Sequence, residues 1–217
     1  MKRFSRVLVV LFFLSLLSNA LAQGDLTPPG APAPTMKTLD QIEPRIPITN
    51  LPYTISSPGS YYLTDSLQGF ASADGITISA DNVTLDLNGF ALVGQPGSFS
   101  GITLTGTRLG ICVRNGSVRE WGIAGIFMLN SINSQVMNVR ASTNALGGIY
   151  IGRGSRIVNC TVSGSAYGGI YIGDGSSAEG CVASGNGIGF AGENGCAIRG
   201  CSASENSSVG IKKKKKS

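Results

Sequence analysis

Carboxylates and arginines are the side chains of this sequence that could carry acid–base chemistry, because the chain contains no histidine. After Asp86 the acidic residues are few: Glu120, Asp174, Glu179, Glu193 and Glu205. Hydrolysis of a glycosidic bond needs two carboxylates held about 5 to 10 Å apart. Asp174 and Glu193 are separated by close to one repeat length and could approach each other. The sequence favours the alternative that both are solvated turn residues.

A cationic base would have to be Arg153 or Arg156, which follow the segment containing Tyr150. Such a base removes a proton that a bound metal cluster has made acidic, and the sequence offers no such cluster. We therefore assign no catalytic residue, and keep only three weak candidates: Asp174, Glu193 and Arg153.

Metal ligands are scarce in the sequence. Asp81 and Asp86 flank a strand-like segment, but calcium takes about six to eight oxygen ligands. We expect Asp81 in a turn and Asp86 on the outward face of a strand. Zinc-type Cys-x-x-Cys spacing is absent from the sequence. We predict no metal and no cofactor.

Three aromatic residues, Phe127, Tyr150 and Tyr171, are the candidate binding residues. Each stands between two apolar residues of a repeated phrase. Because side chains alternate along a strand, inward apolar neighbours place these rings on the outer face. A row of aromatic rings there suits stacking against sugar rings. The alternative is an aromatic ladder that only shields strand edges or a neighbouring loop.

The repeated phrase organises the chain. It reads Gly-Ile-Tyr-Ile-Gly at Gly148–Gly152 and again at Gly169–Gly173. Looser copies begin at four other glycines: Gly75, Gly101, Gly125 and Gly187. Between residue 75 and residue 169 successive copies lie roughly 21 to 26 residues apart, too close for a strand plus a packing helix. The spacing predicts a solenoid of short strands, with about six coils over residues 53–211.

Other positions repeat with the same period. Cys160, Cys181 and Cys201 recur once per repeat, beside apolar residues. In a solenoid such columns become inward ladders. We expect one ladder of Ile126, Ile149, Ile170 and Ile188. We expect another of Met128, Ile151, Ile172 and Phe190.

The five cysteines allow two interpretations. Their odd number leaves at least one thiol free. Because three of them share a column beside alanines, where cysteine acts as a small hydrophobe, a ladder of free thiols is favoured. A bridge between neighbouring coils remains open, since the strand spacing permits it.

The amino end predicts export. Basic residues precede an apolar run over residues 7–17, and Ala20-Leu21-Ala22 fits a cleavage site, so residues 1–22 are expected to be a signal peptide. The run is shorter than the roughly 20 residues that span a bilayer, and no transmembrane segment is expected after cleavage. Residues 23–52 are a proline-rich leader or linker. The expected location is secreted, periplasmic or extracellular.

The net charge of +5 overstates the basic character of the body. Three cations lie in the signal and five are Lys212 to Lys216, which leaves nine cations against 12 acids. A nucleic-acid-binding surface is therefore not expected. Residues 212–217 are either a polycation tail or the product of a frameshift in a longer reading frame.

A resemblance to a known family supports this architecture. The stretch Asp74–Gly89 and the coils after it resemble right-handed parallel β-helix proteins of the pectin-lyase-like superfamily. The leader, over residues 26–45, and the segment Pro58–Thr64 look like those of secreted bacterial β-helix repeat proteins. The resemblance implies an all-β, right-handed parallel β-helix, in a superfamily of polysaccharide lyases, glycoside hydrolases, adhesins and non-catalytic repeats.

Two functions are therefore expected as alternatives. The first is a non-catalytic extracellular module for binding or structure, with polysaccharide as the expected partner. The second is a polysaccharide lyase or glycoside hydrolase whose catalytic coils are truncated or degenerate. The sequence does not determine an oligomeric state.

Overall fold

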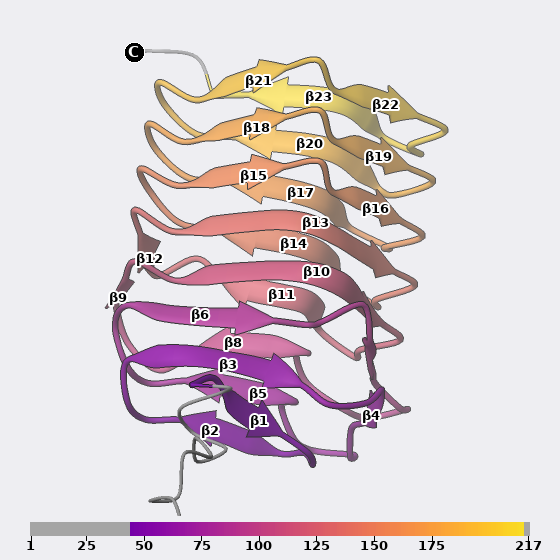
Figure 1. The fold of residues 1–217 in the computed structure, drawn as a ribbon. Helices are drawn as coiled ribbons and strands as arrows, with labels where there is room; N and C mark the ends of the chain where they lie inside the picture. The colour runs from indigo at the N-terminus through magenta and orange to yellow at the C-terminus, as the bar shows by residue number, and fades with distance from the viewer. Residues whose placement is uncertain (1–43, 215–217) are drawn as a thin grey trace, which may run out of the picture. The chain divides into compact units, whose positions relative to one another are not determined.

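The chain winds into an all-β parallel solenoid, as predicted (Figure 1). This computed structural model describes residues 44–214, and there is no helix among them. The predicted signal peptide, residues 23–43 of the predicted leader and residues 215–217 lie outside the described part. Strand pairing between successive coils is parallel from β1 to β23.

Sheet B receives one strand from each coil. Its strands, in order, are β2 (Tyr53–Ile55), β5 (Ile76–Ile78), β8 (Ile102–Leu104), β11 (Ala124–Met128), β14 (Gly147–Ile151), β17 (Gly168–Ile172), β20 (Ile188–Gly192) and β23 (Val209–Lys213). Eight stacked strands correspond to about seven turns of the solenoid between the first strand and the last. The sequence predicted about six, because β2 and β23 continue the stack without the full phrase.

Sheet A has 13 strands and forms the opposite wall (Figure 1). Its main path is β1 (Ile46–Ile48), β3 (Gly59–Leu63), β6 (Val83–Asp86), β10 (Cys112–Arg119), β13 (Gln135–Ser142), β15 (Arg156–Val158), β18 (Ser177–Glu179) and β21 (Ala197–Arg199). Five further strands of the sheet lie off this path, joined to it through β10 and β13. They are β4 (Leu67–Gln68), β7 (Ala91–Val93), β16 (Thr161–Ser163), β19 (Val182–Ser184) and β22 (Ser202–Ser204). Two short strands, β9 (Arg108–Leu109) and β12 (Ser131–Ile132), pair separately.

The sheets extend slightly past the predicted boundaries of residues 53–211. Strand β1 lies within the predicted leader, pairs with β3, and buries Ile48 completely. Arg45 stacks over the ring of Tyr62 at 4.5 Å. At the other end, Lys212 and Lys213 belong to β23. The solenoid therefore includes residues on both sides of the predicted span.

The inward ladders hold the core, but the last member predicted for each of the two ladders is wrong. Ile149 pairs with Ile170 as expected, whereas Ile170 pairs with Phe190 and not with Ile188. Likewise Ile172 pairs with Gly192 and not with Phe190. The interval from Gly169 to Gly187 is too short for this coil, and Gly189 takes the equivalent place. Phe190 is thereby fully buried. The aligned cysteine and alanine columns, which keep a nearly constant interval here, indicate this register better than the phrase does.

A second inward column is polar. Asn144 accepts a hydrogen bond from Trp121 N at 3.1 Å and donates one to Val118 O at 3.3 Å. Asn186 makes the same pair of bonds higher in the stack, with Ser165 N at 3.0 Å and Val162 O at 3.2 Å. These bonds satisfy buried backbone groups that would be costly to leave unpaired.

Ser165 interrupts this asparagine ladder, and its buried Oγ has no hydrogen-bond partner. The amides of Asn144 and Asn186 lie against glycines of sheet B. In the coil between them, the side chain of Val162 fills the corresponding space beside Gly148. Val162 occupies a column that holds alanine at 141 and 183. The Val162–Ser165 pair therefore replaces the Ala–Asn pair of its neighbours.

This replacement predicts coupling between the two positions. Val162→Ala alone should destabilise by about 1 to 2 kcal/mol through a cavity. Ser165→Asn alone should cost about 1 to 3 kcal/mol through overpacking. The double variant should recover at least about 1 kcal/mol of the summed loss. Urea unfolding of the four proteins measures the coupling, and additive effects would contradict the proposed exchange of volume.

Candidate functional site

The outer face of sheet B carries an aromatic stripe made of Phe127, Tyr150 and Tyr171. These residues are in register on β11, β14 and β17. Ring centroids are 6.0 Å apart for the first pair and 5.9 Å for the second, with interplanar angles of 53° and 61°. Their apolar neighbours along each strand are buried. Alternation along the strands thus puts all three rings outside, as predicted.

Tyr150 leans across glycine backbone. A Cβ atom at Gly168 would stand 2.6 Å from the Tyr150 hydroxyl, and one at Gly147 would meet the same ring. The half-buried phenol is desolvated, which raises the pKa of Tyr150. Small residues at both strand starts therefore let the ring lie close to the backbone of the sheet.

The column of the aromatic stripe holds no aromatic residue in the last two described coils. Tyr171 pairs with Ala191, which in turn pairs with Lys212. A ligand lying along the three rings would therefore meet a small residue and then a cation.

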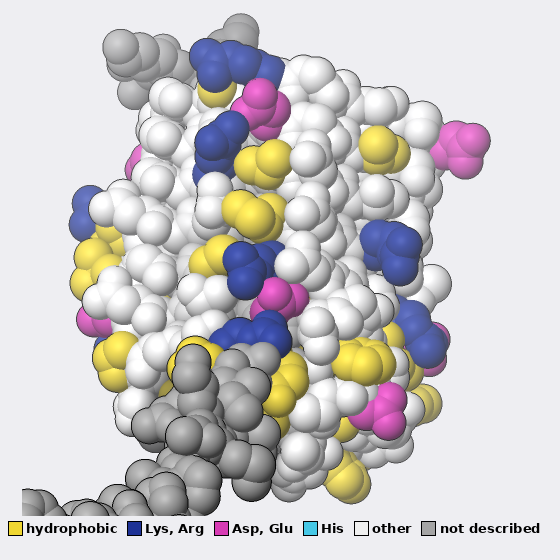
Figure 2. Space-filling view, viewed as in Figure 1, with side chains coloured by type: hydrophobic (Ala, Val, Ile, Leu, Met, Phe, Trp, Pro, Cys, Tyr) yellow, Lys and Arg dark blue, Asp and Glu magenta, His cyan; other side chains and the backbone are white. Residues whose placement is uncertain are grey.

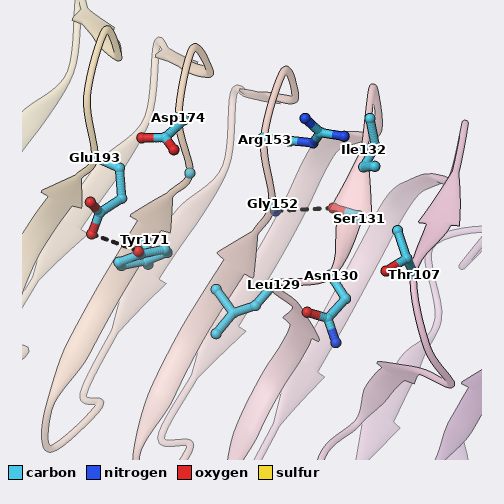
Figure 3. Close-up of a pocket in the computed structure, with 11 residues that line it drawn as sticks. Thr107, Leu129, Asn130, Ser131, Ile132, Gly152, Arg153, Tyr171, Asp174 and Glu193 are labelled. Atoms are coloured by element: carbon cyan, nitrogen blue, oxygen red, sulfur yellow. Dashed lines mark hydrogen bonds between the residues drawn. The ribbon is translucent and has the colours of Figure 1, made fainter.

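A groove of about 460 Å³ runs beside the stripe, where the chain leaves sheet B. Its lining includes Tyr171 and the three weak catalytic candidates, Arg153, Asp174 and Glu193 (Figure 3). Each candidate comes from the turn that follows a sheet B strand, so stacking of the coils gathers them. Figure 3 shows these side chains on successive turns of one rim.

Glu193 is already engaged by its neighbours. Its Oε1 accepts a hydrogen bond from the Tyr171 hydroxyl at 2.8 Å, and its Oε2 pairs with Lys214 Nζ at 3.1 Å. The hydrogen bond from Tyr171, reinforced by Lys214, lowers the pKa of Glu193. Burial, together with this carboxylate, raises the pKa of Tyr171 to about 12. Glu193 is therefore a stable carboxylate that fixes the last ring of the stripe.

Asp174 and Arg153 behave differently from Glu193. Asp174 Oδ1 accepts a hydrogen bond from the backbone of Asn194 at 3.0 Å, which is typical of a turn residue. Arg153 is exposed on the groove rim, and within residues 44–214 its guanidinium forms no ion pair. Arg153 is thus the groove cation available to a ligand.

Part of the groove is lined by residues that do not belong to the repeated phrase. Thr107, Leu129 and Asn130 form its far side (Figure 3). Ser131 Oγ accepts a hydrogen bond from Gly152 N at 3.0 Å. Sequence reasoning missed these residues because they belong to the longer coils, whose extra residues form β9 and β12. The only signal was the lengthening of the repeat.

The two acids considered for calcium have structural partners. Asp81 Oδ1 accepts a hydrogen bond from Leu109 N at 3.0 Å. Asp86 lies on the outward face of β6, as expected, but it is only 6% exposed. It accepts hydrogen bonds from Arg114 Nε at 3.0 Å and Asn115 Nδ2 at 3.2 Å, whose side chains cover it. Within the described residues no group of three or more potential ligands could hold a metal ion.

The face of sheet A is mixed in charge. Figure 2 shows basic and acidic side chains interspersed over it, with apolar side chains between them. The Arg156 and Glu179 side chains pair at 2.6 Å, and Arg199 lies beside Glu179 in the next coil. Neighbouring coils thus place opposite charges together on this side.

Fold and site together define a parallel β-solenoid with an aromatic stripe and an adjoining groove. Comparison with known proteins found no matching family model, no matching curated protein and no matching solved structure. Residues 44–214 contain no helix that is long and apolar enough to cross a membrane.

Proposed function

We propose that this protein is a non-catalytic binding module that holds a polysaccharide along the outer face of sheet B. The aromatic stripe is the observation that carries the proposal. Its rings stand in register on three consecutive coils, so an extended polymer parallel to the solenoid axis would contact one ring per coil. Aromatic faces stack on the apolar faces of sugars, and the adjoining groove supplies Arg153 and Asn130 for polar contacts.

The charge state of the groove supports binding over catalysis. A general acid for glycoside hydrolysis needs a carboxyl group whose pKa is raised. The hydrogen bond from Tyr171 shifts the pKa of Glu193 in the opposite direction. The Glu193 carboxylate is thus not prepared to donate a proton at neutral pH. Asp174 accepts a hydrogen bond from the backbone of Asn194 in the next coil.

The second candidate is a polysaccharide lyase or glycoside hydrolase. One observation favours it: Arg153, Asp174 and Glu193 all line the same groove. Incubating the protein with a neutral β-glucan, xylan and polygalacturonate, with and without calcium, separates the candidates. Binding without cleavage supports the module. Turnover that is abolished by Asp174→Asn would establish the enzyme instead.

Removing two rings of the stripe should weaken binding. The double variant Tyr150→Ala, Tyr171→Ala should lose about fivefold to 150-fold in affinity, since each stacked ring contributes about 0.5 to 1.5 kcal/mol. Affinity electrophoresis against the polysaccharide that retains the wild-type protein measures the loss. Tyr167→Ala is the matched control, because Tyr167 is 69% exposed and lies outside the stripe. Equal retention of the double variant and the control would reject the stripe as the binding surface.

The proposal includes export of the protein. Removal of the signal over residues 1–22 would leave Gln23 as the first residue. Mass spectrometry of the exported protein should find that mature end, and recovery of only the intact chain from the cytoplasm would contradict export.

A further inference from the structure

Three cysteines form a column in the upper turns of the solenoid. Cys160, Cys181 and Cys201 directly precede β16, β19 and β22, which pair in register. All three are free thiols, so the thiol ladder favoured by the sequence is present. Nothing in the aromatic stripe or the groove uses them.

These thiols are close enough to react with each other. Cys181 N donates a hydrogen bond to Cys201 Sγ at 3.4 Å, so the Cys201 sulfur lies against the backbone of Cys181. Neighbouring strands stand about 4.8 Å apart, within the range of about 4.4 to 6.8 Å between the Cα atoms of disulfides. A bond between neighbours therefore needs side-chain rotation and little backbone movement.

Burial differs along the column and decides where a reagent can enter. Cys160 is 1% exposed and Cys181 is fully buried. Cys201 is half-buried, as are Ile198 and Ala203 of the same coil. Cys201 is therefore the thiol that a small molecule reaches first.

We propose that Cys181 and Cys201 are a thiol–disulfide exchange site that a low-molecular-weight disulfide oxidises. The Cys201 thiolate first attacks one sulfur of the reagent, whose S–S bond breaks and releases one reagent thiolate. The Cys181 thiolate then attacks Cys201 Sγ in the mixed disulfide and expels the second reagent thiolate. Two protein thiols are oxidised to one disulfide, and the reagent is reduced to two thiols that take up the two protons.

Burial of the entry thiol sets the pH dependence of the first step. Desolvation raises the pKa of Cys201, so the first step should accelerate as the pH rises.

The disulfide would tie the last described coil to the one before it. Val209 and Ile211 of that coil are 38% and 47% exposed, so its apolar contacts are incomplete. Closing the loop between Cys181 and Cys201 restricts the unfolded chain. Oxidation should therefore protect this coil from local opening.

Thiol counting and peptide mapping test the proposal on the full-length protein. After equilibration with oxidised glutathione, denatured wild-type protein should lose two thiols. Trypsin cleaves after Arg156, Arg199 and Lys212, so Cys201 falls on a different peptide from Cys160 and Cys181. In a Cys112→Ser, Cys196→Ser background, the peptides 157–199 and 200–212 should be joined. Cys181→Ser should abolish the joined species and leave glutathione on Cys201.

Three results would overturn the proposal. They are unchanged thiol counts, glutathione that stays on Cys201 while Cys181 is intact, and a disulfide confined to the peptide 157–199.

Discussion

Replacing Trp121 with alanine is expected to lower the free energy of unfolding by about 3 to 5 kcal/mol. Trp121 is fully buried, and its Nε1 donates a hydrogen bond to Leu92 O at 3.2 Å. A Cβ at Gly75 would stand 2.7 Å from the indole ring, so backbone packs directly on this side chain. The truncation would leave a cavity between three coils and an unpaired carbonyl.

Urea unfolding followed by circular dichroism measures this loss. Phe99→Ala is the matched control, since Phe99 is 43% exposed near the same coils and should change stability by less than about 1 kcal/mol. Equal losses in the two variants would mean that Trp121 does not hold the lower coils together.

Replacing Gly148 with alanine should destabilise the protein by at least about 2 kcal/mol. An added Cβ would stand 2.6 Å from Gly169 O of the next coil and would overlap the side chain of Val162. Backbone on one side and packed core on the other leave no room to relax. The glycine that opens the repeated phrase is therefore required by close approach between coils.

Gly210→Ala is the control for this effect. Gly210 stands in the same column on the last described strand, where an added Cβ would be no closer than 3.5 Å to Ala203. Alanine there should change the free energy of unfolding by less than about 0.5 kcal/mol. Chemical denaturation of both variants is the measurement, and a tolerated Gly148→Ala would refute the packing argument.

Most of the fold could be predicted because a solenoid repeats one physical constraint. Each coil buries its interior only against its neighbours, so inward positions such as Ile149 and Ile170 recur visibly in the sequence. Residues that depart from the repeat in a single coil have no recurring pattern in the sequence by which they could be predicted. Trp121 replaces asparagine in its column, and Val162 with Ser165 replaces an Ala–Asn pair. The burial of Asp86 also depends on partners that stand 28 and 29 residues away.

The candidate site was predictable only where it follows the repeat. The aromatic stripe obeys strand alternation and lies where it was expected. The groove depends on turns whose lengths vary between coils, so its far side at Leu129 and Ser131 was missed. The engagement of Glu193 by Tyr171 and Lys214 follows from the corrected register, which places Glu193 in a column of glycines.

The most direct test of the proposed binding surface is an NMR titration of protein labelled in the tyrosine rings. The ligand is an oligosaccharide cut from the polysaccharide that retains the protein. The ring signals of Tyr150 and Tyr171 should shift as ligand is added, whereas those of Tyr167 and Tyr53 should stay in place. Shifts at Tyr167 with none at Tyr150 or Tyr171 would contradict the account.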